Sequence, residues 1–196
     1  YPVVSGNVSF YNGTNKKNIA PTPVIGGVGL ISKFKRPISH KFCKENSSVF
    51  VIGKTFGHIE RSVFLEEVYS IFEGQPPEIN LANEKNNGET VLELIKKDLI
   101  SSVHDISDGG LITALAEMTF ESNFGIKIDS PKKLTNSFKY LFGEDQSRYI
   151  LEISKNNLEK VEKLLKNNNV FYENIGSTQK DYFEIQGELK IDIKKL

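Results

Sequence analysis

The chain has 196 residues, and its 25 basic and 25 acidic residues give a formal net charge of zero. This balance argues against binding to nucleic acid or an anionic membrane through bulk charge, and no apolar run approaches the roughly 20 residues that span a bilayer. The single cysteine, Cys43, excludes an intrachain disulfide, and no Cys/His cluster has zinc spacing. We therefore expect a cytoplasmic location.

The first segment has the pattern of a β-hairpin. Residues 3–11 and 23–31 are apolar runs that predict two strands, and a polar loop opened by Asn12-Gly13 separates them. The chain begins with Tyr1 and places polar residues of functional type almost at once. We therefore expect it to be the C-terminal piece of a longer protein.

Small polar residues interrupt the first predicted strand. Gly6 allows a ligand to approach the backbone without meeting a Cβ atom. Asn7 and Ser9 are two residues apart, so on a strand their side chains leave the same face. An amide and a hydroxyl placed in this way suit a hydrated cation or a phosphate-bearing ligand.

A polar stretch, residues 32–48, precedes a second unit in which helices and strands alternate. Helix 61–72 is expected to face inward through Val63, Phe64, Val68 and Ile71. The remaining elements follow in chain order. Strands are predicted at 50–52, 126–128, 148–153, 170–175, 182–185 and 189–193, and helices at 86–99, 110–120 and 158–165. This mixture predicts an α/β sandwich with a mixed sheet.

Two runs in the second unit have the composition of binding loops. In residues 104–111, His-Asp-Ile-Ser-Asp-Gly-Gly-Leu, the helix start can hold a phosphate, but Asp108 is also a good N-cap. In residues 143–148, Gly-Glu-Asp-Gln-Ser-Arg, the choice lies between ligand contact and a solvated turn in which Arg148 pairs with Glu144 or Asp145. His40 and His58 lie in polar loops without a suggestive acid or nucleophile, and we expect both to be exposed.

Residues 2–12, together with 21–26, resemble phosphoribosylformylglycinamidine synthase, in its large synthetase subunit. Residues 104–118 and 141–149 resemble the C-terminal domain of the same family, so three motifs occur in the expected order. The resemblance implies that residues 1–46 are the terminal strands and linker of the second N-terminal-type synthetase domain. Residues 47–196 would then be the second C-terminal-type domain of the aminoimidazole ribonucleotide synthetase superfamily.

The resemblance also implies an activity for the longer protein. Family members convert formylglycinamide ribonucleotide, ATP and ammonia to formylglycinamidine ribonucleotide, ADP and phosphate in purine biosynthesis. A glutaminase subunit supplies the ammonia, and in many bacteria a small third subunit bridges the complex. The present chain alone is expected to be inactive.

Position by position, the resemblance places Gly6 against ATP, Asn7 on Mg²⁺ and Ser9 on the substrate ribonucleotide. It assigns no catalytic acid or base to this chain. Gly13 stands where the family usually has Glu, which favours a plain hairpin turn at that point. In the second half of the family's chain, the runs at 104–111 and 141–148 surround a non-catalytic site, where a nucleotide with a structural role is the most that is expected.

Two alternatives remain open at this point. The chain could come from another superfamily member, such as aminoimidazole ribonucleotide synthetase, although the run from Ser5 to Asn12 argues against this. It could also act as a non-catalytic module that binds nucleotide or docks to the glutaminase.

Overall fold

A computed structural model describes residues 2–9, 11–19, 22–30, 37–120, 122–129 and 136–196. The chain forms two compact units, Tyr1–Phe34 and Lys35–Leu196. The domain boundary between residues 46 and 47 stays a prediction. No helix within the described ranges is both long and apolar enough to cross a membrane.

The strands predicted in the first unit are absent from its described residues. Residues 2–9 and 22–30 have no regular secondary structure, and all of them are exposed. A short hairpin joins β1 (Gly13–Thr14) to β2 (Lys17–Asn18), and its turn lies at Asn15 and Lys16, which both have positive φ angles. The turn predicted at Asn12-Gly13 is therefore wrong. Residues 10 and 31–36 lie outside the described residues.

The physical reason is that a strand needs a neighbour. Val3 is 90% exposed and Val28 is fully exposed, so these apolar runs do not pack against each other within the first unit. A two-stranded hairpin without a further layer is marginal in water. The apolar pattern of residues 3–11 and 23–31 is typical of strands, but the described residues of these runs do not form them.

The second unit contains the predicted mixed sheet. Its strand order is β4-β6-β3-β7-β5-β8-β9, and β5 and β8 are parallel while the other neighbouring pairs are antiparallel. The strands are β3 (Ser48–Ile52), β4 (Ser102–Asp105), β5 (Gly125–Ile128), β6 (Tyr149–Ile153), β7 (Tyr172–Gln179), β8 (Tyr182–Ile185) and β9 (Leu189–Asp192).

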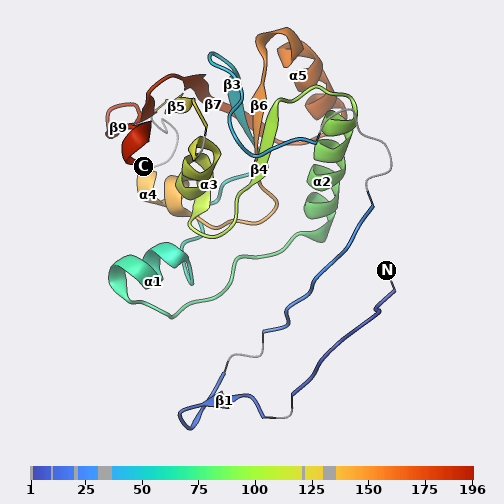
Figure 1. The fold of residues 1–196 in the computed structure, drawn as a ribbon, viewed down its shortest axis with the longest axis vertical. Coiled ribbons are helices and arrows are strands. Elements are labelled where there is room, and N and C mark those ends of the chain that lie inside the picture. Colours follow the sequence, from blue (N-terminus) through green and yellow to red (C-terminus); the bar gives the residue numbers. More distant parts are fainter. Residues whose placement is uncertain (1, 10, 20–21, 31–36, 121, 130–135) are drawn as a thin grey trace. The chain divides into compact units, whose positions relative to one another are not determined.

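Helices cover both faces of this sheet (Figure 1). The helices are α1 (Val63–Tyr69), α2 (Leu81–Lys96), α3 (Gly110–Thr119), α4 (Ser137–Phe142) and α5 (Leu158–Asn167). Val49 and Val51 of β3 belong to one core with α3 and α4, whereas Phe50 and Ile52 belong to the other core with α2 and α5. Successive side chains of a strand point to opposite faces, so the central strand joins two apolar layers. The predicted sandwich is confirmed.

Two predicted helices differ from the structure. Helix 61–72 is shorter, because α1 ends at Tyr69, where Ser70 takes a left-handed conformation. None of its residues is buried, and the predicted inward face is only partly correct, because Phe64 stacks on Phe142 of α4 whereas Val68 is 59% exposed. Helix 86–99 begins earlier than predicted, because the Asn80 side chain accepts a hydrogen bond from the backbone N–H of Asn83 and caps α2.

A buried acid ties the segment before β3 to the sheet. Glu152 of β6 is completely buried, and its carboxylate accepts hydrogen bonds from the backbone N–H groups of Cys43 (2.9 Å) and Lys44 (3.0 Å) and from the Ser102 hydroxyl (2.8 Å). A buried carboxylate with several donors is satisfied without a cationic partner. Residues 43–44 are thus fixed parts of the second unit.

Candidate functional site

The predicted site residues of the first unit are all exposed. A Cβ atom built on Gly6 would meet no described atom within 4 Å. Asn7 and Ser9 lie on a segment without strand structure, so the argument that their side chains leave one face of a strand does not apply to this structure. The roles of Gly6, Asn7 and Ser9 remain predictions.

The start of α3 is built on glycines instead of the predicted aspartate cap. Gly109 is the N-cap residue, with φ of 77°, and as a glycine it provides no capping side chain of its own. Asp108 is exposed, so its predicted role as the N-cap is wrong. Gly110 also has a positive φ, and a Cβ atom there would lie 2.7 Å from the Phe142 carbonyl carbon. The close passage of the loop after α4 therefore requires glycine.

A carboxylate of the chain itself occupies this helix start. Glu144 Oε1 accepts hydrogen bonds from the backbone N–H of Gly109 and from that of Val63 at the start of α1, both at 2.8 Å. A negative charge is favourable at such a position because several backbone N–H groups converge there. The anion that the sequence allows at residues 104–111 is therefore supplied internally by Glu144.

Asp145 and Arg148 of the same loop form a buried, hydrogen-bonded pair, which is called the hub below. Asp145 is 4% exposed, and its carboxylate accepts from the backbone N–H groups of Phe56 (3.0 Å), Gly57 (2.9 Å) and His58 (3.1 Å). Arg148 is 1% exposed and donates to the Gly143 carbonyl (2.5 Å), the Asp145 carbonyl (3.1 Å) and Thr55 Oγ1 (3.2 Å). The solvated-turn interpretation of residues 143–148 is wrong, because these side chains hold loops together inside the fold.

Electrostatics explain why the pair is tolerated inside the protein. Burial lowers the pKa of the Arg148 guanidinium below its ordinary value, and the charge of Asp145 opposes that shift. The closest approach between Arg148 Nη1 and Asp145 Oδ2 is 4.0 Å. The guanidinium stays charged, since arginine is not deprotonated in proteins. A charged group this deeply buried needs its hydrogen bonds.

Two of the histidines, His40 and His104, lie side by side, and the third, His58, lies in the loop after β3. His104 on β4 is partly buried, and its Nε2 lies 3.2 Å from Glu117 Oε2. The ring of the exposed His40 meets the His104 ring edge-on, with centroids 5.4 Å apart. His58 is partly buried, and its Nε2 lies 2.9 Å from the Gln75 carbonyl, so its predicted exposure is only partial. Among the described residues, no His, Cys, Asp and Glu cluster could hold a metal ion.

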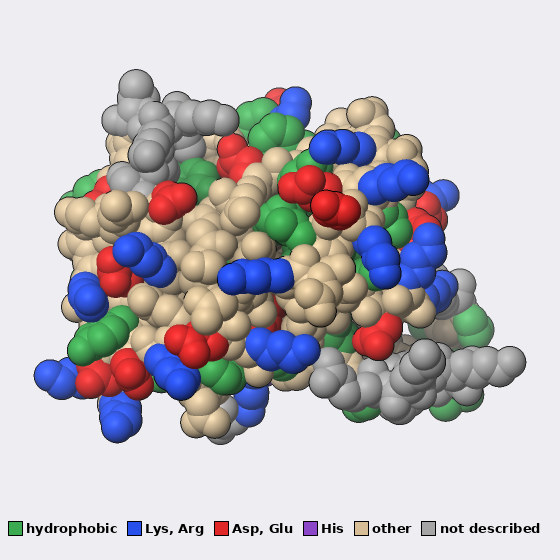
Figure 2. Space-filling model, turned by 90° about the horizontal axis from the view of Figure 1, so that it is seen from above, with side chains coloured by type: hydrophobic (Ala, Val, Ile, Leu, Met, Phe, Trp, Pro, Cys, Tyr) green, Lys and Arg blue, Asp and Glu red, His purple; other side chains and the backbone are tan. Residues whose placement is uncertain are grey.

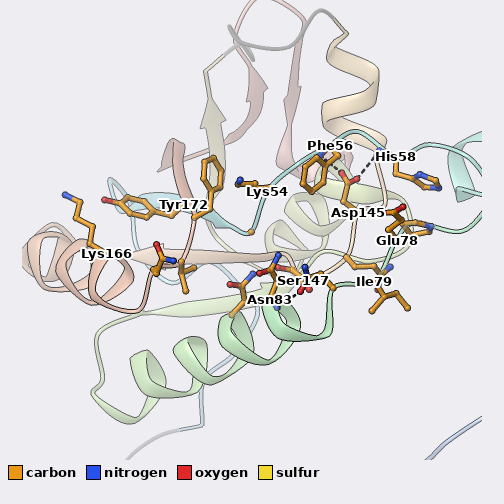
Figure 3. Close-up of a pocket in the computed structure, with 18 residues that line it drawn as sticks. Lys54, Phe56, His58, Glu78, Ile79, Asn83, Asp145, Ser147, Lys166 and Tyr172 are labelled. Atoms are coloured by element: carbon orange, nitrogen blue, oxygen red, sulfur yellow. Dashed lines mark hydrogen bonds between the residues drawn. The ribbon is translucent and has the colours of Figure 1, made fainter.

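One cavity of about 1020 Å³ lies beside the hub, where β3 ends and β7 begins (Figure 3). The loop after β3, the segment leading into α2, the loop before β6 and the end of α5 contribute to its wall. Its cationic, amide and aromatic side chains include Lys54, Phe56, Asn83, Lys166, Phe171 and Tyr172.

The lysine, amide and aromatic side chains of this cavity are suited to binding a small ligand. Lys54 Nζ lies 5.8 Å from the centre of the Phe171 ring, a cation–π distance. Asp145 lines the wall, but its carboxylate is already engaged by backbone donors. Exposed lysines, amides and aromatic rings together can contact an anionic group beside a flat apolar one. Asp145, Gln146 and Ser147 of this wall belong to the candidate binding run 143–148, whereas the other lining residues were not predicted as a site.

Comparison with known proteins decides the family. Residues 44–187 match the family described as AIR synthase related protein, C-terminal domain. The chain belongs to this family.

Several relatives within the AIR synthase related family are similar along the whole chain. Phosphoribosylformylglycinamidine synthase subunit PurL of Pelagibacter ubique is 47% identical over 196 residues, and the PurL subunit of Rhodopseudomonas palustris strain HaA2 is 42% identical over 195 residues. These alignments cover the complete chain but only 27% and 26% of the relatives. The chain thus spans about a quarter of the length of the curated relatives it matches.

Solved structures agree on the fold. Thermotoga maritima PurL complexed with FGAR has a TM-score of 0.65 at 15% identity, covering 81% of this chain and 29% of that one. T. maritima PurL complexed with ATP has a TM-score of 0.60 at 14% identity, covering 80% and 26%. At such identities the likeness establishes the AIR synthase related fold alone.

Proposed function

We propose that this chain is part of an ATP-dependent carbon–nitrogen ligase of purine biosynthesis. The complete enzyme would convert formylglycinamide ribonucleotide, ATP and ammonia to formylglycinamidine ribonucleotide, ADP and phosphate. The observation that carries the proposal is the 47% identity, over the full 196 residues, to a protein named phosphoribosylformylglycinamidine synthase subunit PurL. Because the relatives carry this name, the chain is assigned to this synthase in preference to aminoimidazole ribonucleotide synthetase.

The proposed reaction proceeds in two steps. The amide oxygen of the substrate attacks the γ-phosphorus of ATP, so ADP leaves and an iminophosphate forms. Ammonia then adds to the activated carbon and loses a proton, and the C–O bond to phosphate breaks. Positioning of the two ligands and stabilisation of the phosphate charge are the protein's main contributions to such a transfer.

Gly6, Asn7 and Ser9 are proposed to form one wall of the complete site. Gly6 would lie against ATP, Asn7 would offer its amide oxygen to Mg²⁺, and Ser9 would contact the ribonucleotide. Magnesium prefers several oxygen ligands, including carboxylates. Since the described residues do not form a metal cluster, one amide does not fit the ion by itself, and other parts of the synthase would provide the remaining ligands.

Partners follow from the same proposal. Ammonia would come from a glutaminase subunit, with a small bridging subunit in the complex, and the assembly would work in the cytoplasm. The solved structures similar to this chain include T. maritima PurLQS, with a TM-score of 0.59. No role for nucleic acid or a membrane is proposed.

Replacing Asn7 by alanine in the full-length synthase is expected to lower kcat/KM for amidine formation by about 10-fold to 100-fold, the range typical when one group around a metal ion is lost. The Mg²⁺ concentration needed for half-maximal rate should rise. Steady-state assays with ammonia, run across a magnesium series, measure both effects. Asn18→Ala, an exposed asparagine on β2, is the matched control. An unchanged rate and magnesium dependence for Asn7→Ala would contradict the assigned role.

A further inference from the structure

The cavity beside the hub is large enough for a ligand of its own. Its volume of about 1020 Å³ is at the upper end of the range for small-molecule sites. All of its described lining residues belong to the second unit. They do not include Gly6, Asn7 or Ser9, to which the ligands of the proposed reaction are assigned. A ligand in this cavity would therefore be additional to those of the proposed reaction.

Hydrogen bonds hold the wall of the cavity in place. Gly53 donates from its backbone N–H to the Phe171 carbonyl (2.9 Å), which joins the loop after β3 to the residue before β7. The Asn87 side chain donates to the Ser147 carbonyl (2.9 Å), and the Ser147 hydroxyl donates to Glu84. Helix α2 thereby fixes the loop before β6. A wall that is already ordered loses little conformational entropy when a ligand binds.

The lysines of the cavity have few acidic neighbours. In Figure 3, Lys166 and Glu78 lie at opposite ends of the cavity, with Lys54 between them. Within the described part of the chain, Lys54 forms no ion pair, and Lys166 Nζ is 4.0 Å from Glu162 on the same helix. The face seen in Figure 2, by contrast, intersperses lysine and arginine with aspartate and glutamate. An ammonium group of this kind suits a phosphate.

Three amide side chains of the cavity are available to a ligand. Asn83, Gln146 and Asn169 line the wall, and none of their side chains is hydrogen-bonded to another described residue. Each amide offers two donors and an acceptor oxygen, and a hydroxyl group can both donate and accept. The amides therefore suit the hydroxyl groups of a sugar.

The aromatic rings of the cavity favour a sugar over a flat base. The Tyr172 ring is stacked on the Phe50 ring with centroids 5.5 Å apart, and Lys54 Nζ lies 5.8 Å from the centre of the Phe171 ring. Of the phenyl and phenol rings in the described wall, only that of Phe56, which is 78% exposed, has no such partner. One free ring cannot sandwich a base, but its partly negative face attracts the polarised C–H groups of a sugar.

We propose that this cavity is a binding site for a phosphorylated sugar. The phosphate lies at Lys54, and the sugar hydroxyls contact the amides of Asn83, Gln146 and Asn169. Phe56 covers one face of the sugar ring. The proposal stands on the cavity and does not depend on the proposed ligase activity.

Calorimetric titration of the full-length protein with ribose 5-phosphate tests the proposal. Lys54→Ala should raise the Kd at least about tenfold, because a hydrogen bond to a charged group is lost. Asn83→Ala should raise it by about 2-fold to 10-fold and leave the Kd of inorganic phosphate unchanged, since only a contact to the sugar is removed. Lys160→Ala, an exposed lysine on α5 outside the cavity, is the matched control and should change neither value.

Several outcomes would overturn the proposal. One is a lack of binding, and another is an equal Kd for ribose 5-phosphate and inorganic phosphate, which would reduce the site to an anion site. Binding that is unaffected by Lys54→Ala would place the ligand elsewhere in the protein. AMP binding that depends on Lys54 and is about tenfold tighter than that of ribose 5-phosphate would show that a base is recognised.

A second measurement keeps the test valid if a variant fails to fold. Hydrogen exchange of residues 53–58 in the unmodified protein is compared with and without ribose 5-phosphate. Slower exchange with the ligand supports the site, and unchanged exchange contradicts it. Amidine formation is assayed separately, so that failure of the proposed function is distinguished from failure of this site.

Discussion

Replacing Arg148 by alanine is expected to lower the free energy of unfolding of the 196-residue chain by about 3–5 kcal/mol, the usual cost of removing one member of a buried charged pair. The guanidinium is 1% exposed and donates to Gly143, Asp145 and Thr55. Its removal leaves these acceptors without their donor and also opens a cavity. Urea unfolding followed by circular dichroism measures the loss.

Two further variants sharpen this experiment. Lys160→Ala, on the exposed side of α5, should change stability by no more than about 0.5 kcal/mol. Arg148→Lys keeps the charge but not the planar set of donors, so its loss should be intermediate. A loss below about 1 kcal/mol for Arg148→Ala would show that the buried hub does not stabilise the fold, since ordinary surface substitutions already reach half that value.

Asp145→Ala is expected to destabilise the chain by about 3–5 kcal/mol for a related reason. The backbone N–H groups of residues 56–58 lose their common acceptor, and the Arg148 guanidinium loses its nearest carboxylate, at 4.0 Å. The same unfolding measurement applies, with Asp108→Ala as the control because Asp108 is exposed and caps no helix.

The combination of the two changes gives a separate check on the hub. Because Asp145 and Arg148 interact, the double variant should lose less stability than the sum of the single losses. Strict additivity, or an Asp145→Ala loss as small as that of Asp108→Ala, would contradict the structural role given to Asp145.

The fold of the second unit could be predicted where periodicity and burial agree. Strand 148–153 and helix 110–120 were placed within a residue or so of β6 and α3, because both are strongly apolar and lie in the core. The strand predictions for the first unit were wrong for the opposite reason. Its apolar runs have strand character, but strands form only against a partner, and these runs do not pack against each other within the first unit.

The buried polar residues were harder to predict. Glu144, Asp145 and Arg148 have the composition of a surface turn, and nothing in one sequence shows that three loops converge on them. Glu152 did leave a signal, since a single acid inside the apolar run Tyr-Ile-Leu-Glu-Ile at 149–153 indicates a buried carboxylate with donors. For the cavity, only the run 143–148 gave a signal, because the rest of its wall comes from separate segments of the chain.

The most direct test of the central claim is an assay of the full-length protein that contains this chain. Formylglycinamide ribonucleotide, ATP and ammonia are supplied, and the amidine product and ADP are quantified together. We predict one ADP for each formylglycinamidine ribonucleotide in the full-length protein, and neither product from the 196-residue chain alone. Sustained turnover by the isolated chain, or ATP hydrolysis by the full-length protein without amidine formation, would contradict the account.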